Sequence, residues 1–154
     1  MARLARLVPA AQAATHAHDD AAAELLGVNR TDLRCLGVVL ERGPLSASDL
    51  ATTVGLTRGA MTTALDRLER TGYVRRREDP ADRRGVRVEA TAAARKAVRD
   101  VWEPVGAAGL ELLERYDDRE LAALCRFFEA YVQVQSAHTA RLRSLTSRRS
   151  RRPT

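Results

Sequence analysis

Residues 46–91 read SASDLATTVGLTRGAMTTALDRLERTGYVRRREDPADRRGVRVEAT, and they contain the patterns most specific for the fold. Its first half predicts two short helices on either side of a tight turn. Ser46 is a typical N-cap, with Asp49 in the third position of a capping box, and Gly55 ends this helix after about two turns. Thr57 is a second N-cap and begins another helix.

The second of these helices, predicted over residues 58–70, is amphipathic. Helical spacing places its apolar residues in one stripe: Met61, Ala64, Leu65 and Leu68. The opposite face carries polar and charged residues: Arg58, Thr62, Thr63, Asp66, Arg67 and Arg70. We therefore expect one face to pack on a core and the other to face outward.

The hydrophobic period changes after Gly72, where that helix is expected to end. Residues 73–78 and 86–91 are two strand candidates, because apolar and charged residues alternate in the second of them. Turn-forming residues and two arginines lie between the strands, at positions 79–85. The sequence predicts a hairpin with a long, basic tip.

Two short helices across a glycine-containing turn, followed by a basic hairpin, are typical of a winged helix-turn-helix. The helix over 58–70 is then the recognition helix, because a major groove about 12 Å wide admits one helix. Arginines at the hairpin tip suit the narrow minor groove beside it. We expect DNA contacts from Thr57, Arg58, Thr62, Thr63, Arg67, Arg77, Arg83 and Arg84. Each arginine alone is more often part of a solvated face, and only the ordered set favours DNA binding.

Helical periodicity predicts four further helices, so the fold class is mainly α with a small β-hairpin wing and a helical region outside the winged domain. The first helix covers about 9–26, and the second begins at the N-cap Thr31 and reaches residue 41. A long helix follows the N-cap Thr91 and is expected to bend or break between Pro104 and Gly109. Asp117 opens the last helix, whose apolar stripe continues to residue 135.

A set of short motifs accompanies this layout: Leu50-Ala51, Gly55-Leu56, Thr57-Arg58, Asp66-Arg67-Leu68-Glu69, Gly72-Tyr73-Val74 and Asp79-Pro80-Ala81-Asp82-Arg83-Arg84, followed by Val88 and Thr91. The set resembles the multiple antibiotic resistance regulator (MarR) family, with specific motifs over residues 31–91. The resemblance implies an obligate homodimer whose first, fifth and sixth helices form the interface and whose two winged domains read a palindrome. It also implies that Asp82 braces the wing and that Arg84 enters the minor groove.

The chain departs from the family pattern in the winged domain. Ala90 stands where the family usually has leucine, and Gly59 and Ala60 stand where hydroxyl side chains are common. The resemblance further implies an aromatic or acidic small-molecule effector in the crevice between the dimerisation helices and the winged domain. Arg34 and Trp102 are the candidate ligand-binding residues, although a lone tryptophan on an apolar stripe is more often a core residue.

The chain has 154 residues, of which 45% are hydrophobic, and a net charge of +6. This length suffices for one domain without a disulfide or metal. Apolar runs are too short to span a bilayer and the N-terminus does not resemble a secretory signal, so we expect a cytoplasmic protein with reduced thiols. The positive excess lies in residues 30–91 and 139–154. The latter is interpreted as a solvated disordered end, with added attraction for phosphate as the alternative.

Histidines and cysteines do not form a metal-binding pattern. His16 and His18, two residues apart on a helix, point about 200° apart. Cys35 and Cys125 are predicted to be small core residues, with redox sensing as the minority alternative because an arginine neighbours each. No nucleophile with a base and an orienting group stands out. We expect no enzyme activity, no cofactor and no metal.

The predicted organisation is an N-terminal helix for dimerisation (1–29), a winged helix-turn-helix (30–91), C-terminal dimerisation helices (92–145) and a basic disordered tail (146–154). The function that fits is a homodimeric, sequence-specific transcriptional regulator, most simply a repressor released by a ligand. The alternative is a winged-helix module that binds protein, or binds DNA without sequence preference through its arginine-rich tail.

Overall fold

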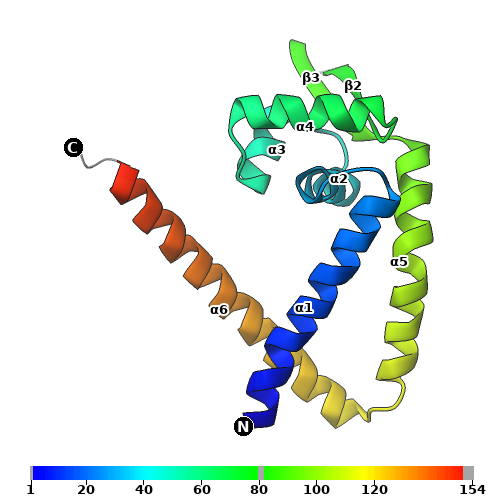
Figure 1. Ribbon diagram of the computed structural model, residues 1–154, viewed down its shortest axis with the longest axis vertical. Helices are drawn as coiled ribbons and strands as arrows, with labels where there is room; N and C mark the ends of the chain where they lie inside the picture. Colours follow the sequence, from blue (N-terminus) through cyan, green and yellow to red (C-terminus); the bar gives the residue numbers. More distant parts are fainter. Residues whose placement is uncertain (1, 80–81, 151–154) are drawn as a thin grey trace. The chain divides into compact units, whose positions relative to one another are not determined.

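Figure 1 shows a computed structural model of the chain, which describes residues 2–79 and 82–150, except for the side chains of residues 82–85 and 147–150. The elements in chain order are α1 (Ala2–Leu25), α2 (Arg30–Arg42), β1 (Leu45–Ser46), α3 (Ala47–Val54), α4 (Arg58–Arg70), β2 (Val74–Asp79), β3 (Asp82–Ala90), α5 (Ala92–Leu113) and α6 (Asp118–Ser150). The predicted class, mainly α with a small hairpin, is confirmed. None of the helices in the described ranges is both long and apolar enough to cross a bilayer.

The helix-turn-helix forms as its capping residues predict. The Ser46 hydroxyl accepts a hydrogen bond from the Asp49 backbone N–H at 3.0 Å, and Gly55 ends α3 in the left-handed conformation with φ of 77°. The Thr57 hydroxyl accepts from the Ala60 N–H at 3.3 Å. Both helices therefore begin where a side chain replaces a missing backbone partner.

Four of the helices differ in extent from the sequence predictions. Asn29, not Thr31, is the N-cap of α2, since its side chain accepts from the Asp32 N–H at 2.9 Å. α1 begins at Ala2 and contains Pro9, because alanine-rich flanks favour helix on both sides. α5 runs through Pro104 without interruption. α6 continues to Ser150, so residues 146–150, expected to be disordered, are helical.

A hydrophobic core lies at the centre of the first of two compact units, Met1–Pro104 and Val105–Thr154. It combines residues of α2, α3, α4, β2 and β3 with the start of α5. The most completely buried large side chains are Leu36, Leu50, Met61, Leu65, Leu68, Val39, Val74 and Val88. The whole apolar stripe predicted for α4 is buried, and the stripe therefore determines which face of α4 is turned outward.

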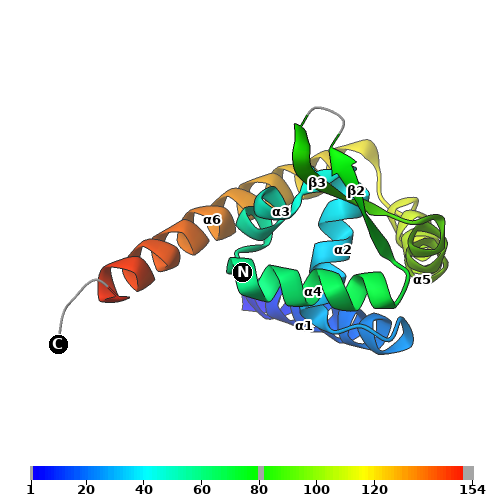
Figure 2. The same cartoon turned by 90° about the horizontal axis from the view of Figure 1, so that it is seen from above.

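The hairpin projects from the helical body of this unit (Figure 2). The sheet order is β1-β3-β2, all antiparallel, with Val88 of β3 opposite both Leu45 and Arg76. β1 was not predicted, because two residues are too few to show a period. β3 begins at Asp82, four residues earlier than the predicted strand, and residues 80 and 81 of the predicted tip lie outside the described residues.

Thr91 joins the hairpin to the helices at its base. Its hydroxyl accepts from the Ala94 N–H at 3.1 Å, as expected of an N-cap, and donates to the Gly72 carbonyl oxygen at 2.7 Å. Ala90 and Ala94 are both buried beneath this junction. The hydroxyl thus links the end of α4, the end of β3 and the start of α5.

The two cysteines have different environments. Cys35 is fully buried in the core, as predicted, and its burial raises the pKa of the thiol to about 11. Cys125 was predicted to be a core residue, and this is wrong for the single chain, where it is exposed. The reason is that α6 buries none of its residues 118–146 in a single chain.

Burial of Cys35 predicts slow thiol chemistry. In a Cys125→Ser variant, whose one remaining thiol is Cys35, we expect reaction with a disulfide reagent at pH 8 only at the rate at which the protein unfolds. A raised pKa keeps the thiol protonated at that pH. Urea at concentrations that unfold the protein should make the thiol react fast. A fast, urea-independent reaction would show that Cys35 is accessible.

Candidate nucleic-acid interface

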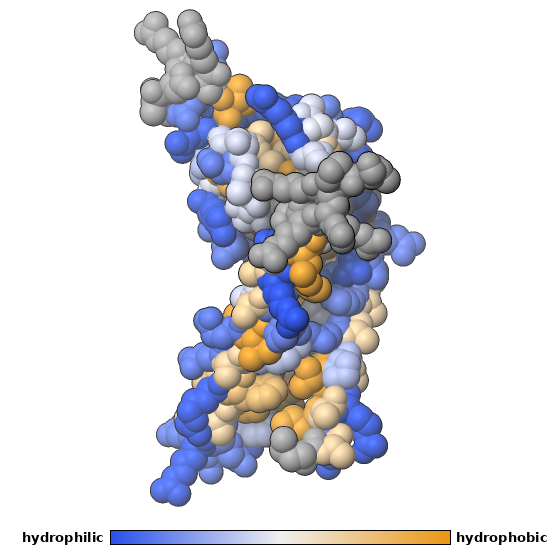
Figure 3. All heavy atoms as spheres, turned by 90° about the vertical axis from the view of Figure 1, so that its left-hand side faces the viewer, coloured by the Kyte–Doolittle hydropathy of each residue, from blue (hydrophilic) through white to orange (hydrophobic). Residues whose placement is uncertain are grey.

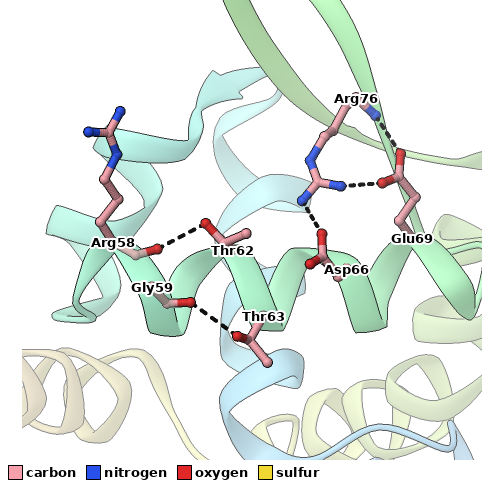
Figure 4. Close-up of polar contacts among 7 residues, drawn as sticks. All are labelled: Arg58, Gly59, Thr62, Thr63, Asp66, Glu69 and Arg76. Atoms are coloured by element: carbon pink, nitrogen blue, oxygen red, sulfur yellow. Dashed lines mark hydrogen bonds and ion pairs between the residues drawn. The ribbon is translucent and has the colours of Figure 1, made fainter.

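The outer face of α4 is open to solvent. Thr62 and Thr63 are exposed on the sides turned away from the buried stripe, and Arg58 is exposed in the first turn of the helix. The Thr62 hydroxyl donates to the Arg58 carbonyl oxygen and the Thr63 hydroxyl to the Gly59 carbonyl oxygen, both at 3.1 Å. Figure 4 shows Arg58 extending away from the helix on the same side as Thr62, with Thr63 on a different side of α4. The exposed face thus offers a cation and two hydroxyl oxygens that can still accept hydrogen bonds.

The start of α4 is suited to a negatively charged ligand. Thr57 satisfies one of the free N–H groups of the first turn, and the remaining ones point out of the helix. The helix dipole adds partial positive charge there, and this turn contains no acidic residue. Arg58 adds a full charge at the same end.

Arg67 differs from the other predicted contact residues. Its Nε donates to Asp32 Oδ2 at 2.7 Å and its Nη2 to Asp32 Oδ1 at 2.6 Å. The Asp32 side chain is 1% exposed and that of Arg67 is 35% exposed. Hydrogen bonding to Asp32 raises the pKa of the Arg67 guanidinium above its ordinary value. The geometry gives Arg67 a role in joining α4 to α2.

The sequence patterns considered above did not identify Asp32 as a residue of the site, although the sequence contains a signal for it. It stands at helical spacing from Cys35, Leu36 and Val39, and all four are buried. A carboxylate on an otherwise buried stripe indicates a buried cationic partner, since an unpaired buried charge is very unfavourable. The sequence does not say which arginine supplies the charge.

The wing is tied to α4 by Arg76 of β2. Its guanidinium donates to Asp66 Oδ1 at 2.6 Å and also forms an ion pair with Glu69 (Figure 4). Both carboxylates belong to the outer part of α4 and would otherwise repel phosphate. Arg76 therefore offsets one of the two negative charges of Asp66 and Glu69 while it holds β2 beside the helix.

Other wing arginines are paired across the strands. Arg75 and Arg77 of β2 both form ion pairs with Glu89 of β3, and Arg87 donates to Asp79 at 2.8 Å. Arg77, expected to contact DNA, thus shares a carboxylate with Arg75. Asp82, Arg83 and Arg84 belong to β3, where Asp82 pairs with Asp79, but their side chains lie outside the described residues.

Within residues 2–79 and 82–150, no side-chain hydrogen bond or ion pair is formed by Arg58 or Arg70. These two arginines are therefore the unneutralised cations of α4. The paired arginines and the unpaired ones were indistinguishable in sequence, because their carboxylate partners come from other elements.

The two candidate ligand residues have separate partners. The Arg34 Nη2 donates to the Val54 carbonyl oxygen at 3.0 Å, at the end of α3. Trp102 of α5 contacts the ring of His18 in α1 edge to face, with centroids 5.6 Å apart. Both tryptophan and histidine are half-buried. No cluster of three potential metal ligands occurs among the residues that the structure describes.

Comparisons with known proteins identify the family. The family model described as the MarR family matches residues 26–85. An uncharacterized HTH-type transcriptional regulator, YcgE of Bacillus subtilis (strain 168), is 34% identical over 123 residues, which cover 80% of this chain and 80% of YcgE. A second B. subtilis regulator, YfiV, is 35% identical over 78 residues, about half of each chain.

Solved structures share the fold. RV1404 from Mycobacterium tuberculosis superposes with a TM-score of 0.71 at 21% identity, covering 86% of this chain and 92% of RV1404. MarR from E. coli, in its apo form, gives a TM-score of 0.61 at 24% identity, covering 82% and 93%. Since a relative above 30% identity covers most of the chain and the motifs and fold agree, the chain belongs to the MarR family of winged helix-turn-helix transcriptional regulators.

Proposed function

We propose that the protein is a sequence-specific DNA-binding repressor that acts as a homodimer on a pseudo-palindromic operator. The observation that carries the proposal is the orientation of α4: its apolar stripe is buried, Thr62 and Thr63 are exposed away from that stripe, and Arg58 is exposed at the start of the helix. A helix presented in this way fits a major groove, with residues near its N-terminus at the base edges. Thr57 caps the end that would face phosphate.

The wing supplies the second contact of the proposed complex. Arg83 and Arg84 lie in the stretch of the hairpin that would reach the adjacent minor groove, with Asp82 as their brace. Ion pairs hold Arg75, Arg76 and Arg77 within the wing and against α4. We therefore assign direct contacts to the tip and to α4, and a supporting role to the arginines at the wing base.

Replacement of Arg58 tests the assignment of α4. Arg58→Ala should weaken binding to a duplex that the wild-type protein selects from a random library, by about 1–3 kcal/mol if the side chain contacts a base. If it contacts a phosphate, the slope of log K against log salt should fall by about 0.9. Fluorescence anisotropy at several salt concentrations measures both quantities.

Arg99→Ala is the matched control, because it removes the same charge from α5, outside α4 and the hairpin. Equal effects of the two substitutions would contradict the assignment of α4. Equal binding of wild-type protein to selected and scrambled duplexes would instead favour the module that binds DNA without sequence preference.

Dimerisation is proposed from the apolar side chains on α6. Phe128, Val132, Leu142 and Leu145 are each at least half exposed in the single chain. Exposed apolar side chains of this kind are visible in orange in Figure 3. Phe128 and Val132 lie on one side of the helix, four residues apart. A second copy of the chain would bury this surface and bring two reading helices to one duplex.

A charge on this side of α6 should separate the two copies. We expect Phe128→Glu to convert the dimer to monomer at micromolar concentration, as measured by sedimentation velocity, since a buried carboxylate without a partner is very unfavourable. Ala130→Glu places the same charge about 200° around the helix and should leave the dimer intact. A wild-type protein that sediments as a monomer would refute the homodimer.

A small acidic or aromatic ligand is proposed to release the DNA. Trp102 supports this proposal because it is the one tryptophan of the chain and its contact with His18 joins α1 to α5. A ligand that inserts beside this ring pair would alter how these two helices pack. Arg34 is assigned to the support of α3 instead.

Trp102 is also the reporter for this proposal. Titration with a panel of aromatic carboxylates should change its fluorescence, and the active compounds should lower operator affinity at least tenfold in the anisotropy assay. A Trp102→Phe variant should bind DNA normally and respond less to the same compounds. Fluorescence changes without any loss of DNA affinity would argue against ligand release.

A further inference from the structure

α2 is bonded to both helices of the helix-turn-helix. On one side, Arg34 donates to the carbonyl oxygen of Val54, the last residue of α3. On the other side, Asp32 accepts two hydrogen bonds from Arg67 of α4. The two contacts lie on either side of the turn that contains Gly55. α2 therefore holds α3 and α4 independently of the turn that connects them.

We propose that Asp32 is a positioning residue for sequence reading: through Arg67 it sets the rotation of α4 and thereby determines how well the protein distinguishes its operator from other DNA. The inference rests on the proposed function. It assigns Arg67 to an internal contact with Asp32 and leaves base contact to residues nearer the start of α4.

The contact between Arg67 and Asp32 is directional. Apolar contacts in the core are non-directional, so the stripe of α4 tolerates small rotations and shifts of the helix. A bidentate guanidinium–carboxylate pair has parallel bonds in one plane and tolerates much less. Arg67 lies four residues after Thr63, on the same side of α4. Fixing Arg67 therefore fixes the direction in which Thr63 faces.

Because Asp32 is buried, its carboxylate requires a hydrogen-bonding partner. Asp32 is 1% exposed, and the described residues leave no buried side-chain nitrogen or oxygen without a partner. A buried ion pair adds little stability over an apolar pair of equal volume, because both charges lose their hydration. An apolar contact could replace the stability of the ion pair but could not reproduce its fixed geometry. The effect of the pair on the position of α4 can therefore be tested separately from its effect on stability.

The test uses the full chain with Asp32→Asn. The DNA probes are a duplex selected from a random library by the wild-type protein and a scrambled duplex of equal length and composition. The substitution removes a negative charge, so simple electrostatics predicts tighter binding to both duplexes. For Asp32→Asn we instead expect a loss of specificity. The ratio of the affinity for the selected duplex to the affinity for the scrambled duplex should fall about tenfold, which is the effect of one wrong base pair.

Asp20→Asn is the matched control. Asp20 forms an exposed ion pair with Arg30 of α2 at 3.1 Å, so this change also removes one aspartate–arginine pair and one charge from the same unit. Its ratio of selected to scrambled affinity should equal that of the wild type. An unchanged ratio in folded Asp32→Asn would overturn the inference while leaving the proposed function intact.

A second variant covers the case in which Asp32→Asn does not fold. Asp32→Leu combined with Arg67→Met replaces the pair by apolar side chains of similar volume, which buried pairs often tolerate. In this double variant the ratio of selected to scrambled affinity should also fall about tenfold, while the slope of log K against log salt should stay unchanged. A slope lowered by about 0.9 would show that Arg67 itself contacts a phosphate and would overturn its internal role. Failure of the wild-type protein to select any sequence would overturn the proposed function and this inference together.

Discussion

Burial of the apolar stripe of α4 is the constraint on which the site depends. Met61, Ala64, Leu65 and Leu68 are almost completely buried, against core residues of α2, α3 and the sheet. Because a helix has one rotation in which such a stripe is buried, the residues opposite to it must face solvent. The exposure of Thr62 and Thr63 follows from this packing, and Arg58 is exposed in the turn that precedes the buried residues. The directional contacts around α2 then refine an orientation that apolar burial has already selected.

The distribution of ion pairs changes how the positive charge of the molecule is understood. The winged region contains many arginines, but carboxylates hold Arg67, Arg75, Arg76, Arg77 and Arg87 within the fold. Apart from the pair between Arg67 and the buried Asp32, these pairs are accessible to water and salt, which weaken them, and they contribute little to stability. Their larger consequence is geometric, because Arg76 joins the wing to α4. Attraction for a duplex is therefore left to fewer cations than the composition suggests.

Several features of the site could be predicted from local sequence because they depend on neighbours within one helical turn. The N-caps at Ser46, Thr57 and Thr91, the stop at Gly55 and the buried stripe of α4 are of this kind. Features that depend on distant residues were missed or misplaced. Arg67 pairs with a residue 35 positions away, and β1 pairs with β3 across 43 positions at Leu45 and Val88. Cys125 was placed in a core that the single chain does not form.

Local sequence patterns indicated the helices, the hairpin and the exposed residues of α4, because periodicity and capping act between residues close in the chain, and the motif set indicated the family. Only the tertiary structure decided which arginines remain free and which are held by carboxylates. Arg58 and Arg67 share one helix and one predicted face, yet only Arg67 meets a buried carboxylate. The physical reason is that an ion pair requires its two groups to be within a few ångströms, and folding alone brings Asp32 to Arg67.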